Sequence, residues 1–191
     1  MRALIVVVGI VGALVTGQAT ASAGPVTPVA APSYETWIAD VTPVANDAKS
    51  YLEQRLPSAG KTAVVFDIDN TTLETQYHFD LLRIPALQPS LAVAQSAKAR
   101  GAAIFFVTGR PALLEAVTKP NLQAVGYPVD GLYQTNLLDV LDLQRYKTAA
   151  RAAIEAAGYT IVANIGNSAS DLAGGHAERT FKLPDYDGAL N

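Results

Sequence analysis

Short apolar runs alternate with helix-like segments from about residue 62 onward, and this alternation leaves few folds open to the chain. The first run, residues 62–66, is rich in β-branched residues, which is typical of a strand buried on both faces. The other runs are residues 102–107, 131–134, 160–165 and 180–182. Strands that alternate with helices form a parallel sheet sandwiched between helices. The sequence therefore predicts an α/β fold built on a three-layer, doubly wound parallel sheet.

Residues that start and stop helices lie between these runs. A helix opens at Pro89-Ser90 and closes at Gly101, because proline fits a first helical turn and glycine favours the end of a helix. Similar signals predict three further helices, over residues 111–117, 120–126 and 144–157.

Two more helices are predicted ahead of the first strand. Ser33 can cap the first of them. Pro43 fits the first turn of a new helix, where its missing N–H costs nothing, and Pro57 ends this second helix. We expect these helices, about residues 34–57, to form an N-terminal extension that packs against the core.

The first 23 residues have the pattern of a secretory signal peptide. A positive start at Arg2 precedes an unbroken run of apolar residues and glycine, residues 3–15, and residues 21–23 have the small-x-small form that signal peptidases cleave. The run is short for a membrane span, so an uncleaved anchor is the lesser alternative. We therefore predict three parts of the chain: a signal peptide at 1–23, a flexible proline-containing leader at 24–33 and one domain at 34–191.

Composition excludes several classes of protein. The chain is 50 % apolar and 16 % charged, which argues against disorder, and it has no cysteine for a disulfide framework or a thiolate zinc site. Loss of Arg2 with the signal peptide leaves 13 basic and 17 acidic side chains, a net charge of −4. Nucleic-acid binders normally carry a basic face, so we expect no dedicated nucleic-acid partner and a secreted, acidic, soluble chain without membrane contact after cleavage.

Polar residues follow three of the predicted strands directly, at residues 67–71, 108–110 and 166–168. Ligands of parallel α/β sheets bind outside the carboxyl ends of the strands, so these residues are candidates for a site. Asp67 and Asp69 would repel each other by several kcal/mol at an effective dielectric constant of about 20, and a cation or a proton would relieve this. Oxygen ligands without cysteine favour a hard ion such as magnesium.

Two simpler interpretations compete with a magnesium site. A helix–loop–helix calcium site is excluded, because Thr71 and Thr72 stand where a ligand and a glycine are needed. A turn or capping cluster of Asp69, Asn70 and Thr71 stays open as the alternative.

Four segments together form a more specific pattern. Residues 66–73 contain Asp-x-Asp-x-Thr after an apolar run, residues 106–110 read Phe-Val-Thr-Gly-Arg, Lys147 opens a helix, and residues 164–172 contain Gly-Asn-Ser-Ala-Ser-Asp. In this order they resemble the four signatures of the haloacid-dehalogenase (HAD) superfamily of phosphatases. Residues 179–184 are further similar to the acid phosphatases and plant vegetative storage proteins of its subfamily IIIB. The resemblance covers about residues 34–184.

The resemblance implies a phosphatase that works through a covalent intermediate. Asp67 would be the nucleophile and form an aspartyl-phosphate, and Asp69 would protonate the leaving alcohol and then activate water. Magnesium would bridge the Asp67 carboxylate, the backbone carbonyl of Asp69 and a phosphate oxygen. Thr108 and the N–H of Gly109 would hold phosphate oxygens, and Lys147 would neutralise their charge. In isolation Thr108 is equally typical of a turn, and Lys147 of a solvated helix end.

One residue departs from the family pattern. Family members usually carry an acid where Asn167 stands, and that acid completes the metal site. An amide oxygen can coordinate magnesium but brings no charge, so we expect weaker binding, with Asp171 one helical turn later compensating directly or through water. The predicted metal ligands are thus Asp67, Asp69, Asn167 and Asp171.

The spacing of the four segments bears on how open the site is to substrates. About forty residues separate Asp67 from Thr108, and about as many separate Thr108 from Lys147, so the predicted strands and helices leave little room for an inserted cap domain. We expect an essentially capless, open site. Residues 77–79 could form one wall of it or simply pack, and Arg110 could contact phosphate or cap a helix.

The favoured function is a secreted, magnesium-dependent acid-phosphatase-like hydrolase of small phosphate monoesters. Two alternatives remain: an exported storage or phosphate-binding relative with little or no turnover, which Asn167 favours, and a phosphotransferase that passes the phosphate to an alcohol.

Overall fold

The computed structural model describes residues 30–78, 80, 82–136 and 138–190. The predicted signal peptide, most of the predicted leader and Phe79 lie outside the described residues. At the described end of the leader, Ala31 packs against the core and the Pro32 carbonyl accepts a 2.9 Å hydrogen bond from the Tyr77 hydroxyl. Among the described helices, none combines the length and the apolar character that crossing a bilayer requires.

Five parallel strands form one sheet in the order β3-β2-β1-β4-β5. The strands are β1 (Lys61–Phe66), β2 (Ala103–Pro111), β3 (Gly131–Thr135), β4 (Tyr159–Gly166) and β5 (Arg179–Lys182). The helices are α1 (Tyr34–Arg55), α2 (Gln88–Ala99), α3 (Glu115–Ala124), α4 (Leu143–Ala156) and α5 (Ala169–Leu172), with short 3-10 helices η1 (Ala112–Leu114) and η2 (Asp139–Leu141). Each predicted strand is present.

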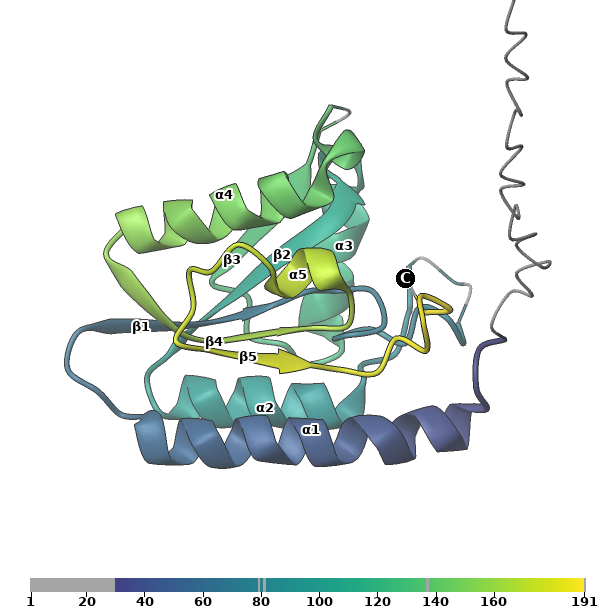
Figure 1. Cartoon of the computed structure of the whole chain (residues 1–191), viewed down its shortest axis with the longest axis horizontal. Coiled ribbons are helices and arrows are strands. Elements are labelled where there is room, and N and C mark those ends of the chain that lie inside the picture. Colours follow the sequence, from purple (N-terminus) through teal and green to yellow (C-terminus); the bar gives the residue numbers. More distant parts are fainter. Residues whose placement is uncertain (1–29, 79, 81, 137, 191) are drawn as a thin grey trace, which may run out of the picture.

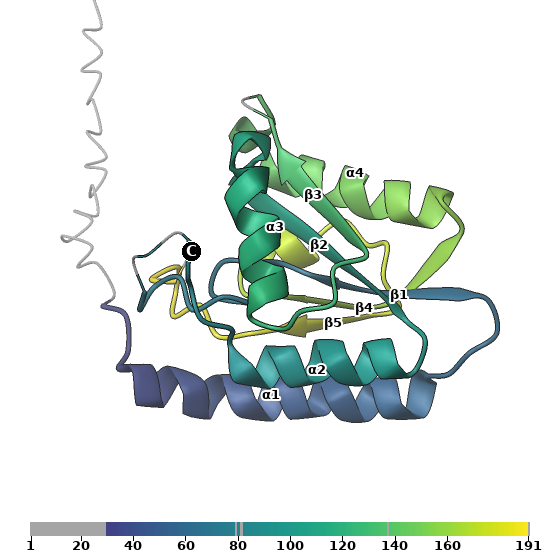
Figure 2. The same ribbon diagram turned by 180° about the vertical axis from the view of Figure 1, so that it is seen from behind.

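Helices cover both faces of the sheet (Figures 1 and 2). The larger apolar cluster joins α1, α2 and Leu122 of α3 to one face, and the smaller cluster joins Ala150 and Ile154 of α4 to the other. This arrangement confirms the predicted three-layer, doubly wound α/β fold. The described residues between Asp67 and Lys147 form the layers themselves and contain no separate cap domain.

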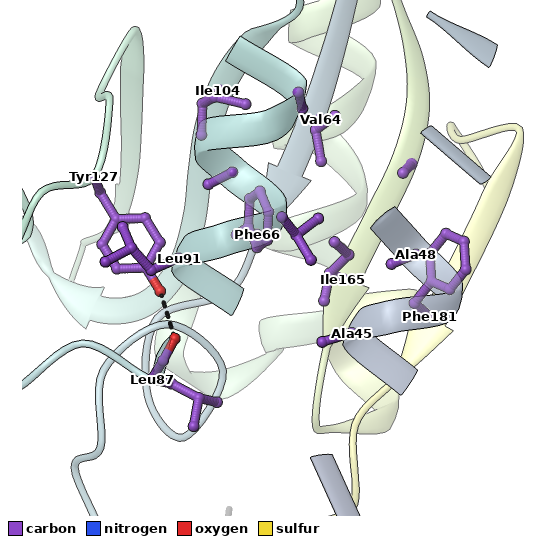
Figure 3. Packing of buried hydrophobic residues seen from close by; sticks show 14 of the residues in the cluster. Ala45, Ala48, Val64, Phe66, Leu87, Leu91, Ile104, Tyr127, Ile165 and Phe181 are labelled. Atoms are coloured by element: carbon purple, nitrogen blue, oxygen red, sulfur yellow. Dashed lines mark hydrogen bonds between the residues drawn. The ribbon is translucent and has the colours of Figure 1, made fainter. Parts of the chain in front are cut away.

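Buried apolar side chains pack around Phe66, the last residue of β1 (Figure 3). The rings of Phe66 and Phe106 stack with centroids 6.1 Å apart, and the Tyr127 ring meets Phe106 edge-on at 5.7 Å. The buried Tyr127 hydroxyl donates to the carbonyls of Thr72 (2.9 Å) and Leu87 (3.3 Å). These contacts fix the loop after β1 to the core, and this loop carries the candidate site.

The prediction of two N-terminal helices is wrong, because α1 runs unbroken through Pro43. A proline in a helix interior loses one backbone hydrogen bond, here the one that the carbonyl of Ala39 would accept. The Thr42 hydroxyl donates to the neighbouring carbonyl of Ile38 at 2.6 Å. One continuous face of the helix is buried on both sides of the proline; its members are Trp37, Val41, Ala45, Ala48 and Leu52. Burial of this face outweighs the local cost of proline.

The segment after β2 also differs from its prediction. Residues 111–117 and 120–126 were expected to form two helices, but β2 extends to Pro111 and a single helix, α3, continues through Pro120. Asn121 anchors α3 from within: its side chain accepts from Ile84 N and donates to Ile84 O, both at 2.8 Å. A buried tertiary contact again overrides a local stop signal.

A fully buried arginine holds α5 against α4. Arg151 donates to the carbonyls of Asp171 (2.5 Å) and Gly175 (3.0 Å), and also to Ala173 O. These carbonyls lie at the C-terminal end of α5 and beyond it, where a short helix leaves acceptors without intrahelical partners. Arg151 therefore replaces the backbone donors that a longer helix would supply.

We expect Arg151→Met to lower the free energy of unfolding by about 3 kcal/mol, because it removes the buried guanidinium that joins three carbonyls of α5 and the following turn to α4. Chemical denaturation monitored by circular dichroism would measure this. Arg145→Met on the same helix is the control, since the Arg145 side chain is exposed and its pair with Asp142 spans 3.6 Å; a change within about 0.5 kcal/mol is expected. Equal losses in the two variants would contradict the anchoring role.

Candidate active site

The candidate site lies where the order of the strands reverses. β1 and β4 are neighbours, and the chain leaves β1 toward β2 and β3 but leaves β4 toward β5. Such a switch point opens a crevice at the carboxyl ends of the two strands. A cleft of about 410 Å³ lies there, and five of the predicted site residues line it: Asp67, Asp69, Gly109, Lys147 and Asn167. The parallel sheet thus brings together residues up to a hundred positions apart.

Asp67 is buried at the end of β1 beside Lys147, whose Nζ donates to Asp67 Oδ1 at 2.8 Å. Burial, and then the charge of the nearby Asp171 carboxylate, raises the pKa of Asp67 to about 7, although Lys147 opposes the rise. Burial disfavours the Lys147 ammonium, but Asp67 and Asp171 outweigh this and raise the pKa of Lys147. Lys147 is therefore charged, and its single positive charge faces two carboxylates.

Both carboxylate oxygens of Asp171 accept hydrogen bonds from neighbouring groups. One oxygen accepts from Lys147 Nζ, and the other accepts from Ser168 N at 2.7 Å, as part of the capping box that begins α5. Direct ligation of a metal by Asp171 stays a prediction; the observed contacts favour a role in holding Lys147 against Asp67.

Asp69 is paired with Arg110, which the sequence left open between a phosphate contact and a helix cap. Arg110 donates to both Asp69 oxygens, from Nε at 3.0 Å and from Nη2 at 2.7 Å, and the Thr75 hydroxyl adds a 2.8 Å bond. Burial opposes ionisation of Asp69, but the hydrogen bonds and charge of Arg110 outweigh burial and lower the pKa of Asp69. The two carboxylates thus have pKa values shifted in opposite directions.

Thr108 and Gly109 come from the extended end of β2. Gly109 lines the cleft, and its carbonyl accepts from the Thr135 hydroxyl at 2.9 Å. Thr108 is fully buried and does not line the cleft; its hydroxyl accepts from Arg110 N at 3.1 Å. In this arrangement Thr108 supports the backbone that presents Gly109 and Arg110, and its predicted phosphate contact stays a prediction.

Asn167 supplies an amide to the site at the end of β4. Its Oδ1 accepts from the Thr71 hydroxyl at 3.0 Å, and its Nδ2 donates to Leu190 O at 2.8 Å. Together with the Asp67 carboxylate and the Asp69 carbonyl, which accepts no hydrogen bond from the described residues, this gives an all-oxygen donor set. No cluster of three or more His, Cys, Asp or Glu suited to a metal occurs in the described part of the chain. The donors present fit a hard ion such as magnesium, with few charged ligands.

Tyr77 and His78 do not line this cleft. They border a separate cavity of about 540 Å³, where His78 Nε2 lies 3.1 Å from the buried Glu74 and the Tyr34 hydroxyl donates to Glu74 at 2.8 Å. Tyr77 stacks on the ring of Trp37 with centroids 5.0 Å apart. Of the two roles considered for these residues, the structure supports packing.

A parallel sheet with two carboxylates and a lysine at its switch point is the architecture of HAD-type α/β proteins. A profile of the HAD superfamily, subfamily IIIB (Acid phosphatase), matches residues 82–189, and the chain belongs to this family. The matched residues begin after Asp67 and Asp69, so this match supports the later signatures rather than the first.

Curated relatives agree with this assignment. The chain is similar to the stem 28 kDa glycoprotein of Glycine max, with 39 % identity over 111 residues, which is 53 % of this chain and 42 % of the relative. It is also similar to acid phosphatase 1 of Solanum lycopersicum, with 28 % identity over 171 residues, 76 % of this chain and 66 % of the relative. The chain thus spans less than half the length of the stem glycoproteins that it matches.

Solved structures show the same fold. The class C acid phosphatase from Bacillus anthracis superposes with a TM-score of 0.64 at 17 % identity, covering 82 % of this chain and 83 % of that one. A chain of the Pnkp1/Rnl/Hen1 complex gives a TM-score of 0.59 at 14 % identity, over 68 % of this chain and 48 % of that one. At these identities the likeness establishes the fold and nothing finer.

Ionisation of buried Asp67 lowers the free energy of unfolding of the chain, so this free energy depends on pH. An unfolded aspartate has a pKa of about 3.9, whereas Asp67 in the folded chain has one of about 7. Between these values the folded state binds the extra proton, so the free energy of unfolding falls as the pH rises and the loss is complete above about pH 7. At pH 8 without divalent ions, we expect Asp67→Asn to raise the melting temperature by roughly 5 °C.

The stabilisation by Asp67→Asn should shrink as the pH is lowered from about 8 to about 5, which thermal melts at several pH values would measure. Asp47→Asn is the control, because the Asp47 side chain is exposed and takes part only in a surface ion pair with Arg179. A stabilisation that does not depend on pH would show that Asp67 does not ionise in this range.

Proposed function

We propose that this protein is a magnesium-dependent phosphomonoester hydrolase that works through an aspartyl-phosphate on Asp67. The observation that carries the proposal is the pairing of Asp67 with Lys147 at the switch-point cleft, 2.8 Å apart, with Asp69 beside them on the same loop. Membership of the subfamily IIIB acid phosphatase family supports the same reaction. The substrate is a small phosphate monoester, since the cleft is open and no cap domain occurs among the described residues.

In the first step an oxygen of the Asp67 carboxylate forms a bond to phosphorus, and the bond from phosphorus to the leaving oxygen breaks. Asp69 delivers a proton to that leaving oxygen, so the alcohol departs neutral. In the second step water attacks phosphorus, Asp69 takes up its proton, and the bond between Asp67 and phosphorus breaks to release inorganic phosphate. Lys147 and the N–H of Gly109 stabilise the charge on the transferring oxygens, with Thr108 as a further phosphate contact.

Magnesium would be held by the Asp67 carboxylate, the Asp69 carbonyl and the Asn167 amide oxygen, with Asp171 as the further predicted ligand. When bound, the ion supplies positive charge that offsets repulsion between Asp67 and the substrate anion. Asn167 adds no charge of its own, so we infer weak binding of the ion.

Secretion is part of the proposal. The predicted signal peptide at residues 1–23 and the similarity to plant stem glycoproteins support an exported protein. Its net charge of −4 after cleavage supports neither a nucleic-acid partner nor attachment to an anionic membrane surface.

The direct test is turnover of a chromogenic aryl phosphate in the presence of magnesium. We expect Asp67→Asn to reduce the rate constant kcat by at least about 10⁴-fold, because the nucleophile is lost, and chelation of magnesium to abolish turnover of the unchanged protein. Thermal melts serve as the control for folding, and beryllium fluoride should form an adduct on Asp67. Turnover that survives Asp67→Asn would refute the assigned nucleophile.

The Arg110–Asp69 pair predicts a preference among substrates. Because the pKa of Asp69 is lowered, its ionised form, which can accept a proton from water, is abundant, and its protonated form, which can protonate a leaving group, is scarce. We expect aryl phosphates, whose leaving groups need little protonation, to react faster than alkyl phosphates. Asp69→Asn should then reduce kcat/KM by about 10²-fold or more for alkyl phosphates and less for aryl phosphates. Equal losses for both classes would contradict the acid role of Asp69.

A storage or phosphate-binding function without turnover is the second candidate. The observations that favour it are the amide at Asn167 and the similarity to stem glycoproteins. It predicts binding of phosphate or magnesium with no hydrolysis across a panel of phosphate esters. A phosphotransferase would instead form new phosphate esters when acceptor alcohols are added, so product analysis in the same assay separates the three.

A further inference from the structure

A single backbone carbonyl joins the two loops that build the site. Leu190 O accepts a hydrogen bond from Asn70 Nδ2 and another from Asn167 Nδ2, both at 2.8 Å. Asn70 belongs to the loop after β1 and Asn167 to the loop after β4, and all three residues are buried. Both lone pairs of one carbonyl are therefore used to connect segments that lie about a hundred residues apart in the sequence.

The oxygen of each asparagine is also occupied. Asn70 Oδ1 accepts from Gln76 N at 2.7 Å, and Asn167 Oδ1 accepts from the Thr71 hydroxyl at 3.0 Å. Each side chain thus donates on one side and accepts on the other, which an amide can do and a carboxylate cannot. The hydrogen bonds also fix which way each amide points, with the Asn167 oxygen directed away from Leu190.

The segment that carries this carbonyl is itself held in an unusual conformation. Leu183 N donates to Gly166 O at 2.8 Å where the segment leaves the sheet, and Leu190 N donates back to Asp185 O at 3.1 Å. Between them Tyr186 and Asp187 have φ values of 51° and 52°, which non-glycine residues adopt at some cost. The yellow segment after β5 lies alongside the loop after β1 in both views (Figures 1 and 2).

We propose that residues 184–190, called here the C-terminal strap, are a positioning element of the active site, and that the strap selects asparagine at position 167. The Leu190 carbonyl orients the Asn167 amide, so that its oxygen lies on the side of Thr71 and keeps one lone pair for a further contact. Leu190 itself lines the cleft, so the strap forms part of the site wall as well. The inference deepens the proposed function by assigning a reason to Asn167, the residue that departs from the family pattern.

The preference for asparagine over aspartate at position 167 has an electrostatic basis. Aspartate at position 167 would place a carboxylate oxygen where the amide nitrogen now lies, 2.8 Å from the Leu190 carbonyl oxygen. Two acceptors that face each other in a buried position repel, and the Leu190 carbonyl then keeps only its hydrogen bond from Asn70. The new charge would also join Asp67 and Asp171, which already share the single charge of Lys147. An acid at 167 is therefore unfavourable as long as the strap is in place.

The test is a double-mutant cycle between position 167 and the strap, measured without turnover. The four chains are the full chain, Asn167→Asp, deletion of residues 189–191, and both changes together. In the full chain, we expect Asn167→Asp to lower the metal-free melting temperature at pH 8 by several degrees and to tighten magnesium binding by less than about threefold. In the deletion background, the same substitution should cost less stability, because only the repulsion from Asp67 and Asp171 remains, and it should tighten magnesium binding by about tenfold.

Leu190→Ser provides a second background in case the deletion prevents folding, because it removes the buried side chain that seats the strap. Leu138→Ser is its control, since Leu138 is an exposed leucine outside the cleft. Asn136→Asp is the control for the substitution itself: Asn136 is exposed and its Oδ1 accepts from Leu138 N and Asp139 N, which a carboxylate can also do. We expect neither control to show coupling to position 167.

An equal cost of Asn167→Asp in the full chain and in both strap variants would overturn the proposal, as would a full chain that tolerates aspartate without loss of stability. Magnesium affinity by isothermal titration calorimetry and melting temperature by circular dichroism need no substrate. If every variant fails to bind magnesium or to hydrolyse phosphate esters, the proposed function fails while the stability cycle still decides the role of the strap.

Discussion

The structure is organised around an imbalance of buried charge at the end of β1. Asp67 and Asp171 both contact Lys147, so two carboxylates share one ammonium away from water. An uncompensated charge in such a place is costly unless a proton or a cation joins it. The surrounding elements keep it in place: the Phe66–Phe106 core beneath β1, the α4 helix that carries Lys147, and Arg151, which anchors α5. The cleft is thus poised to gain positive charge, which is what binding of an ion supplies.

The two carboxylates of the loop after β1 experience opposite environments although only one residue separates them. Asp67 is buried against another acid and has a raised pKa, whereas Asp69 is paired bidentately with Arg110 and has a lowered one. Two carboxylates whose pKa values are shifted in opposite directions can take different roles in one reaction, as in other acid–base sites. A carboxylate that needs a counter-ion to stay ionised suits a nucleophile that acts only when a cation is bound. A neighbour with a lowered pKa is mostly ionised, which suits a group that accepts a proton from water.

The sequence predicted what depends on local pattern and on the geometry of parallel sheets. Apolar runs identified the strands, and residues 67–71 and 166–168 met because strand ends share one edge of the sheet. Contacts that depend on distant partners could not be predicted. Pro43 and Pro120 signal helix starts locally, yet burial carries α1 and α3 through them. Nothing near Arg110 marks Asp69 as its partner, and nothing near Asn167 points to Leu190, because these pairs form only once the chain has folded.

The amide at position 167 is best understood from the charge imbalance and the C-terminal strap together. A third carboxylate would strengthen attraction for a cation, but it would add repulsion to a site that already holds excess negative charge and would face the Leu190 carbonyl. Compared with an acid, an amide lacks the charge but keeps an acceptor for the Thr71 hydroxyl and gains a donor for the Leu190 carbonyl. On the proposed function, weak binding of magnesium and a stable metal-free fold would have one cause. On this argument Asn167 is a residue fitted to its surroundings, and loss of the acid is not by itself a sign of lost activity.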